Sequence, residues 1–381
     1  MDFQFSEEQS MLRDTLARYL ADHYDFEARR AAASSAEGWR PACWRAFASE
    51  LGILGAGFPE QLGGLGGGAP EHMIVMEQFG RHLVLEPYLS TVVLGGGALL
   101  HGNKDLAAQW VPAIIGGEVI AGWAHAEPES RYCRHAVRTS AARGGSDYIL
   151  SGHKTVVVGA PFSTHLVVSA RTSGEPRDTG GISLFWIPRD AAGVTVREYP
   201  TIDGARAGEV LLDNVRVPAS QMLGAEGQAL PLIDRLCDAA MTALCAEANG
   251  AMARMLADTI DYARQRKQFG VAIGTFQVLQ HRMADMYMQI EQSVALTQVA
   301  AMQAGAAPRE RALAAAAAKA QAGHAGKFVG QAAVQIHGGM GVTEELAVGH
   351  YFKRVTAIDL QLGSAEHQLR RYADLLYPVA A

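Results

Sequence analysis

Apolar side chains recur at helical spacing toward both ends of the chain, whereas its middle alternates between apolar and polar positions. Near the start, helices are predicted from 7 to 30 (on Met11, Leu12, Leu16, Tyr19 and Leu20), from 41 to 51 and from 71 to 79. From about residue 228 to the end the helical period returns. The long C-terminal stretch therefore predicts a helical bundle.

Between about Gly117 and Gly224 the hydrophobic period shortens toward two. Segments such as DYILSGHKTVVVG, THLVVSAR and ISLFWIP are separated by clusters of Gly, Pro, Asp and Ser, which is typical of strands and turns. The order of helix, strand and helix predicts an α+β protein. We expect a helical domain at 1–117, a β domain at 118–225 and a second helical domain at 226–381.

Composition narrows the class of protein. The chain has 381 residues, of which 49% are apolar and 19% charged, as in ordinary globular proteins of two or three domains. The net charge of -6 is spread without a basic stripe, so nucleic acid is not an expected partner. An acidic start and apolar runs shorter than about 18 residues predict a soluble, unprocessed protein without membrane insertion. Four cysteines without metal-type spacing favour a reducing cytoplasm and no metal site.

One motif carries candidate binding chemistry. Arg266 begins an Arg-x-x-Phe-Gly sequence that ends at Phe269 and Gly270, and Gln277 follows seven residues later. The planar guanidinium of Arg266 suits bidentate contact with phosphate oxygens, and Gly270 lets the backbone leave a helix. The pattern indicates a diphosphate clamp between two helices. The alternative for Arg266 is a solvated arginine at a helix end.

Two further polar turns follow in the last third of the chain. The first is QIHGGMG, with Gln335, Gly338 and Gly339, and the second is GSAE, with Ser364 and Glu366. Three such turns predict one common ligand.

With these turns, FPEQLGGLGGG at 58–68, AEPE at 126–129, SGHKTVVVG at 151–159 and LDNVRVPA at 212–219 make the whole chain resemble the acyl-CoA dehydrogenases, which are flavoproteins. The resemblance implies an N-terminal helical domain, a middle β-barrel and a C-terminal four-helix bundle, with FAD and the acyl chain between the last two. It also implies a tetramer. In the family, several clamp residues grip the adenosine diphosphate of a flavin that belongs to the neighbouring subunit.

The resemblance also places the flavin ring against two segments of the β domain. The first, Trp123 to Pro128, contains Trp123 and Ala124 and has Ala126 where the family usually has threonine. The second has Val156 in place of the ring-contacting tryptophan and Val158 in place of a threonine. We therefore expect fewer polar side-chain contacts to the ring. The alternative for these valines is an ordinary buried strand, and His125 is either structural or catalytic.

The family's catalytic base is missing from its usual positions. The reaction removes a proton alpha to the thioester carbonyl while a hydride leaves the beta carbon for the flavin. The glutamate that usually precedes the Gly of the third turn is Leu362 here, and the position used by a second subgroup is Ala240. The candidates for a displaced base are Glu247 and Asp238, with Asp234 and Asp359 nearby. For each of these carboxylates a structural role is the alternative to catalysis. For Glu247 that role is an ion pair or a subunit contact.

The missing base and the amino-acid sequence of the C-terminal half resemble the small-subunit type of the family. Members of this type are called pimeloyl-CoA dehydrogenase small subunit or occur in bacterial steroid-degrading dehydrogenases, and they pair with a second, related chain. We therefore expect an FAD-dependent enzyme that desaturates an acyl-CoA thioester in fatty acid or steroid side-chain degradation. It would act as one subunit of a hetero-tetramer, or as a homo-oligomer with a displaced base, and pass electrons to an acceptor like electron-transfer flavoprotein. The alternatives are other flavin chemistry, such as oxygen activation, and a non-catalytic partner subunit.

Overall fold

The structure is a computed structural model that describes residues 4–377 and divides into two compact units. The first unit comprises residues 4–31, 69–84 and 241–377, and the second comprises residues 32–68 and 85–240. Helix α7 (Leu230–Gln265) contributes to both. Within residues 4–377, no helix combines the length and apolarity needed to cross a membrane.

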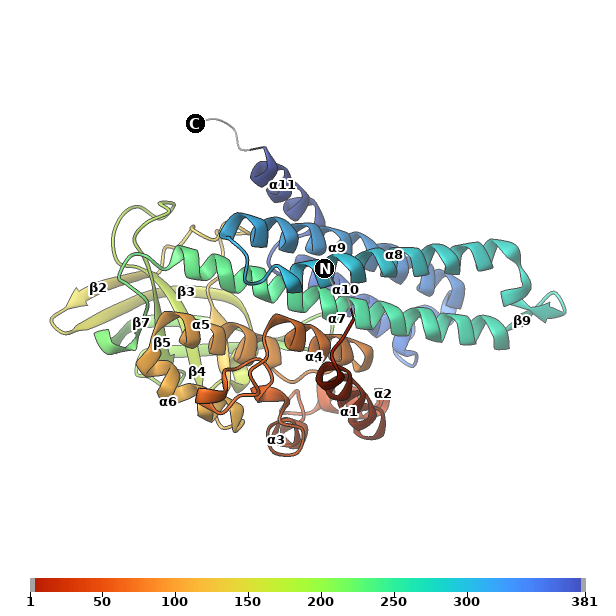
Figure 1. Ribbon diagram of the computed structural model, residues 1–381, viewed down its shortest axis with the longest axis horizontal. Coiled ribbons are helices and arrows are strands. Elements are labelled where there is room, and N and C mark those ends of the chain that lie inside the picture. Colours follow the sequence, from red (N-terminus) through yellow and green to blue (C-terminus); the bar gives the residue numbers. More distant parts are fainter. Residues whose placement is uncertain (1–3, 378–381) are drawn as a thin grey trace. The chain divides into compact units, whose positions relative to one another are not determined.

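The first unit is helical apart from one small hairpin (Figure 1). Its helices are α1 (Glu7–His23), most of α2 (Phe26–Ser34), α4 (Ala69–His82), the later part of α7, α8 (Gln277–Met302), α9 (Pro308–His337), α10 (Ala347–Leu360) and α11 (Ala365–Leu376), with short 3-10 helices at Ile273–Thr275 and Gly338–Val342. Strands β9 (Lys267–Gln268) and β10 (Val271–Ala272) form the hairpin that connects α7 to α8. The predicted C-terminal helical bundle is confirmed.

The helix predicted from 7 to 30 is interrupted. Helix α1 begins at a capping box, in which Ser6 and Gln9 each accept a hydrogen bond from the other's backbone N–H. Tyr24 leaves the helical region at φ -134°, and the Asp25 carboxylate then accepts from the N–H of Ala28 in α2. The apolar period continues across this break, so periodicity alone could not locate it.

Two glycines set the distance between α4 and α7 within the first unit. A Cβ atom on Gly80 would lie 1.9 Å from the carbonyl oxygen of Glu247, and one on Gly250 would lie 1.9 Å from that of Glu77. No side chain fits at such distances in a close-packed interior. Both positions therefore require glycine in spite of its poor helix propensity.

The second unit is built on a mixed sheet of eight strands. The strands are β1 (Ala121–Ala124), β2 (Ser140–Gly144), β3 (Asp147–Val158), β4 (His165–Arg171), β5 (Ile182–Pro188), β6 (Val194–Pro200), β7 (Arg206–Pro218) and β8 (Met222–Leu223). Their hydrogen-bonded order is β6-β7-β3-β2-β4-β5-β8, and β1 pairs with β4 in parallel. The same unit contains α3 (Pro41–Ser49), α5 (Gly97–Gly102), α6 (Lys104–Ile115), a π-helix at Leu89–Gly96 and short 3-10 helices at Ile53–Gly55, Glu60–Leu62, Ala160–Phe162 and Ala219–Gln221.

This sheet is open, whereas the resemblance implied a barrel. Its path begins at β6 and ends at β8, and within residues 4–377 no pairing joins these two strands. Strand β8 is only two residues long, too short to close a ring of strands. The fold class of two helical parts around a middle sheet domain is confirmed.

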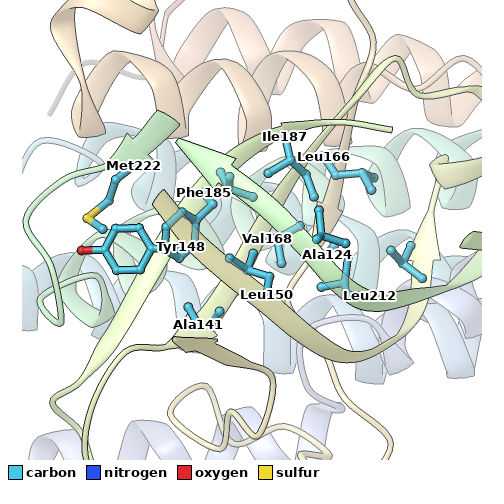
Figure 2. Close-up of a cluster of buried hydrophobic side chains, with 14 of the residues drawn as sticks. Ala124, Ala141, Tyr148, Leu150, Leu166, Val168, Phe185, Ile187, Leu212 and Met222 are labelled. Carbon is cyan, nitrogen blue, oxygen red and sulfur yellow. The ribbon is translucent and has the colours of Figure 1, made fainter. Parts of the chain in front are cut away.

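One face of the sheet carries the hydrophobic core of the second unit (Figure 2). Tyr148 and Leu150 from β3 pack with Phe185 and Ile187 from β5 and with Leu212 from β7. Along β3 the buried residues alternate, as expected for a strand with one covered face. The core therefore fixes which side of β3 points inward.

We predict that Gly250→Ala destabilises the first unit. Overpacking against the carbonyl of Glu77 should lower the free energy of unfolding by about 1–3 kcal/mol, although alanine is the better helix former. Urea denaturation of the variant measures the loss. A matched control is Gly305→Ala, which places its Cβ where no atom lies within 4 Å. Equal stabilities of the two variants would contradict the close helix crossing.

Candidate functional site

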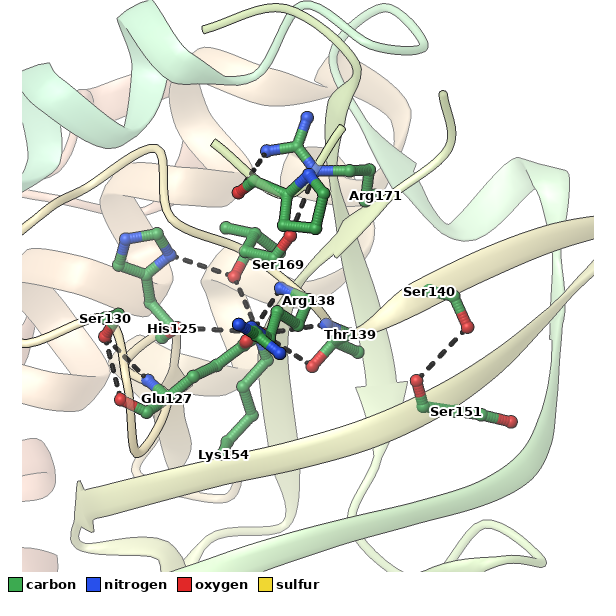
Figure 3. Close-up of polar contacts among 12 residues, drawn as sticks. His125, Glu127, Ser130, Arg138, Thr139, Ser140, Ser151, Lys154, Ser169 and Arg171 are labelled. Carbon is green, nitrogen blue, oxygen red and sulfur yellow. Dashed lines mark hydrogen bonds and ion pairs between the residues drawn. The ribbon is translucent and has the colours of Figure 1, made fainter. Parts of the chain in front are cut away.

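A buried ion pair links the two segments of the second unit that were expected to contact a flavin ring (Figure 3). The Lys154 Nζ atom on β3 lies 2.7 Å from the Glu127 Oε1 atom in the turn after β1, and the two side chains are 0% and 5% exposed. The Thr155 N–H also donates to the Ala126 carbonyl at 2.9 Å. These two links hold the turn after β1 against β3.

Glu127 is surrounded by donors besides Lys154. The backbone N–H groups of Arg138 and Thr139 donate to its carboxylate at 2.7 and 3.0 Å, and the Thr139 hydroxyl donates at 2.7 Å. Burial alone would raise the pKa of Glu127, but the charge and hydrogen bond of Lys154 and the Thr139 donors outweigh it, so the pKa lies below its usual value. The site therefore stabilises the ionised carboxylate.

Lys154 has further acceptors in the Ser169 hydroxyl oxygen at 3.0 Å and the His125 carbonyl at 3.4 Å. Burial lowers the pKa of Lys154 to about 8, with Glu127 opposing that shift. The side chain is thus charged at neutral pH.

His125 belongs to this cluster rather than to an open cleft. Its Nδ1 atom lies 2.9 Å from the Ser169 hydroxyl, which accepts from Lys154 and can donate to a neutral imidazole. Burial, followed by the charges of Lys154 and Arg134, lowers the pKa of His125 to about 3. The contacts favour the structural interpretation of this histidine.

The predicted ring-contact residues are Trp123, Ala124 and Ala126 in one segment and Val156 and Val158 in the other, and the bond between Thr155 and Ala126 links the two segments. Ala124 is buried, whereas Val156 is 54% exposed and has a φ of +51°. Of the three consecutive valines only the middle one, Val157, is buried with a 1% exposed fraction. A plain buried strand therefore does not describe this segment, because its first valine points away from the core.

In the first unit, the predicted clamp side chains of Arg266, Gln277 and Gln335 lie exposed at the surface. Phe269 and Gly270 form the tip of the β9–β10 hairpin with φ of +54° and +83°, and the phenyl ring is 94% exposed. A hairpin with two left-handed residues is the expected turn geometry.

An aromatic contact holds two of the clamp segments together. Tyr262 lies in the last turn of α7, four residues before Arg266. Its ring stacks on the His337 ring with the centroids 4.4 Å apart, and its hydroxyl donates to the His337 carbonyl at 3.3 Å. His337 directly precedes Gly338 and Gly339, beside which a Cβ would meet no atom within 4 Å. The backbone of that turn is therefore open to a ligand. Tyr262 belongs to none of the motifs, so sequence reasoning missed it.

The third turn is organised by a buried lysine. The Lys319 Nζ atom donates to the carbonyls of Asp359 and Gly363 at 2.9 and 3.0 Å, and burial lowers its pKa. Leu362 has a φ of +57°, and its carbonyl accepts from the Gln368 side chain at 2.6 Å. Lys319 is the single cation in an alanine-rich helical stretch, which is the sequence signal for such a role.

After this turn, Ser364 caps α11 by accepting from the His367 N–H at 3.4 Å. Glu366 lies in the first turn of that helix, where backbone N–H groups and the Ser364 hydroxyl lower its pKa. Both residues are thus engaged at a helix start in the first unit.

The two candidate bases are both held by arginines. Glu247 receives two hydrogen bonds of 2.6 Å from Arg354, and its side chain is 3% exposed. Asp238, 1% exposed, lies 3.2 Å from the Arg134 guanidinium, which also contacts Asp234 at 2.9 Å. The contacts favour the structural role that the sequence left open for each carboxylate.

The groups present have the chemistry that a flavin nucleotide needs. In the first unit, exposed arginine and glutamine donors and the open glycine backbone at Gly338 and Gly339 are groups that bind a diphosphate. In the second unit, the buried Trp123 Nε1 atom on β1 has no hydrogen-bond partner within residues 4–377, so an acceptor is missing beside the ring-contact segments. No group of three His, Cys, Asp or Glu side chains within these residues is arranged to hold a metal ion.

Comparison with known protein families assigns nearly the whole chain. Residues 6–118 match the N-terminal domain of acyl-CoA dehydrogenase, residues 122–215 its middle domain and residues 237–376 its C-terminal domain. The chain therefore belongs to the acyl-CoA dehydrogenase family, as its motifs predicted.

Individual relatives agree with this assignment. The chain is 32% identical over 359 residues to acyl-CoA dehydrogenase FadE12 of Mycobacterium tuberculosis (strain ATCC 25618 / H37Rv), covering 90% of this chain and 89% of that one. Its structure is similar to that of the ChsE4-ChsE5 complex from Mycobacterium tuberculosis, with 28% identity, a TM-score of 0.90 and full coverage of both chains. It is also similar to the Tcur3481-Tcur3483 steroid ACAD, with 30% identity, a TM-score of 0.88 and coverage of 97% and 98%.

We predict that Lys154→Met destabilises the second unit strongly. The change leaves Glu127 buried without its cation, which should cost about 3–5 kcal/mol of unfolding free energy. Urea denaturation measures the loss, and Lys154→Met combined with Glu127→Gln should recover part of it. The control is Arg216→Ala. It removes a surface ion pair with Asp147, which lies on β3 as Lys154 does, and should cost under about 1 kcal/mol. The interpretation fails if the two single variants lose the same stability.

We also predict that acid weakens this unit through His125. The unfolded imidazole binds a proton below pH 6.5, whereas the folded one does so only near pH 3. Stability should therefore fall as pH drops through this window. Urea midpoints at pH 7.5, 6.0 and 5.0 should fall less in His125→Asn than in the unmodified protein. Parallel curves for the two proteins would show that His125 does not titrate as described.

Proposed function

We propose that this chain is one subunit of an FAD-dependent acyl-CoA dehydrogenase whose proton-abstracting carboxylate comes from a second, related chain. The observation that carries this proposal is the third turn, where Leu362 occupies the usual position of the base. A leucine side chain cannot exchange a proton. The turn nevertheless keeps its hydrogen-bonded frame through Lys319 and Gln368.

FAD is the cofactor that family membership indicates. When bound, it accepts the two electrons that leave the substrate. In this proposal Arg266, Gln277, Gln335 and the backbone at Gly338 and Gly339 hold the diphosphate-bearing end of an FAD. The segments containing Ala126 and Val156 face a flavin ring.

The two candidate bases, Glu247 and Asp238, are each engaged by an arginine. Glu247 and Asp238 would each have to leave an arginine that is itself mostly buried, since Arg354 and Arg134 are 15% and 14% exposed. Separating a buried charge from its partner costs several kcal/mol. A homo-oligomer with a displaced base is therefore the less favoured form of the proposal.

Similar structures support pairing with another chain and suggest the substrate class. One of them is named as the ChsE4-ChsE5 complex and another as the Tcur3481-Tcur3483 steroid ACAD. We propose a CoA thioester with a steroid-derived or fatty acyl chain as the substrate, and an acceptor like electron-transfer flavoprotein. Four free thiols, of which Cys43, Cys237 and Cys245 are buried, suit the reducing cytoplasm.

The first experiment is the absorbance spectrum of the purified chain, followed by anaerobic addition of short, long and steroid acyl-CoA thioesters. We predict that the chain alone does not bleach, because it has no base. Co-expression with a related chain that carries glutamate at the position of Leu362 should give a yellow complex that bleaches. Bleaching by the chain alone would overturn the proposal.

Two sets of variants sharpen the test. Leu362→Glu restores a carboxylate in the third turn and should allow reduction of the flavin by an acyl-CoA. Leu362→Gln has the shape of glutamate without its carboxylate and should not allow this reduction. Glu247→Gln and Asp238→Asn should leave reduction by the complex intact wherever the variant still folds. If either of these abolishes reduction without loss of structure, the base resides in this chain. A complex that binds FAD and never bleaches would instead indicate a non-catalytic partner subunit.

A further inference from the structure

A bulge lies within the segment expected to face the flavin ring. In the pairing of β3 with β7, Lys154 lies opposite Val210 and Val157 lies opposite Gly208. Thr155 and Val156 therefore share one opposite residue, Glu209. Such a two-to-one arrangement bends a strand and is over-represented beside active sites.

The bulge stores strain at Val156. Its φ of +51° lies in the left-handed region, which a β-branched residue rarely adopts. Glycine would take this conformation without the steric cost of a Cβ atom. A strained residue persists only where its surroundings hold it in place.

On the outer face, the holding group is the residue opposite the bulge. The Glu209 carboxylate accepts a hydrogen bond from the Thr155 hydroxyl at 2.9 Å and makes a close contact with the His153 Nε2 atom. From β6, the Tyr199 hydroxyl donates to the same carboxylate at 3.4 Å. Arg197 lies directly opposite Glu209 in the register of β6 and β7. One carboxylate thus contacts two residues of β3, His153 and Thr155, directly before the strained Val156.

Tyr199 ties the Glu209 carboxylate to β6 through its hydroxyl. Burial raises the pKa of Tyr199, followed by the charge of Glu209. On the inner face, the Lys154 pair with Glu127 and the Thr155 N–H bond to Ala126 hold the neighbouring residues.

We propose that Glu209 is a positioning residue for the flavin site, which holds Val156 in its left-handed conformation through Thr155 and His153. Glu209 itself lies on β7, outside the segments that were expected to contact the ring. Its effect on the cofactor would be indirect, through the shape of β3. This inference rests on the proposed function only where it concerns FAD.

The test begins with a readout that needs no cofactor. Hydrogen–deuterium exchange of the peptide covering residues 153–159 should be faster in Glu209→Ala, because Val156 is then free to leave its strained conformation. In a Val156→Gly background the bulge no longer needs support. There, Glu209→Ala should accelerate exchange far less. Glu198→Ala on β6, whose carboxylate contacts Arg206, is the control and should leave exchange of this peptide unchanged.

FAD affinity provides the second readout, measured by fluorescence quenching in whichever assembly binds the cofactor. Glu209→Ala should raise the FAD Kd about tenfold, and Val156→Gly should reduce that factor. A merely structural Glu209 would accelerate exchange equally in both backgrounds, which overturns the proposal. Faster exchange with unchanged FAD affinity overturns the role in the flavin site. Neither result depends on turnover of acyl-CoA, so failure of the proposed activity remains distinguishable.

Discussion

The buried ion pair between Glu127 and Lys154 is the constraint on which the second unit depends most. Two opposite charges excluded from water are tolerable only when they meet each other and when their remaining hydrogen-bonding positions are filled. Here the Arg138 and Thr139 backbone and the Ser169 hydroxyl fill them. The turn after β1, the start of β2, and strands β3 and β4 are therefore fixed to one point. A flavin-facing surface needs this rigidity, because its shape is set by backbone position when polar side chains are few.

The two units treat polar groups in opposite ways. Around Glu127 every charge is satisfied internally, which makes the segment rigid, whereas the clamp side chains of Arg266, Gln277 and Gln335 lie exposed at the surface. The first arrangement fixes backbone segments, and the second leaves exposed donors of the kind that the proposed function uses to bind a diphosphate.

Periodicity and motifs predicted the fold class, the placement of strands and the family, because these follow from local alternation and from short sequences with one geometric solution. Contacts that join distant parts of the chain were beyond such reasoning. No local sequence pattern predicts that Lys154 pairs with Glu127, or that Arg354 pairs with Glu247. The break at Tyr24 depends on competition between a cap and the helix, and the bulge at Val156 depends on Glu209 in another strand. The open sheet was missed for a related reason, since closure depends on β8, whose two residues carry almost no pattern.

In the proposed function, leucine takes the place of the base in a turn whose hydrogen bonds do not involve its side chain. Lys319 and Gln368 donate to backbone carbonyls, and the Ala365 N–H donates to the Asp359 carboxylate. Exchange of glutamate for leucine therefore removes none of these hydrogen bonds. Glu247 is in the reverse situation, because its carboxylate neutralises a largely buried Arg354 and cannot be recruited for proton transfer without leaving that cation alone. These two properties are what the proposed function requires of this chain, since its base would then come from a second, related chain.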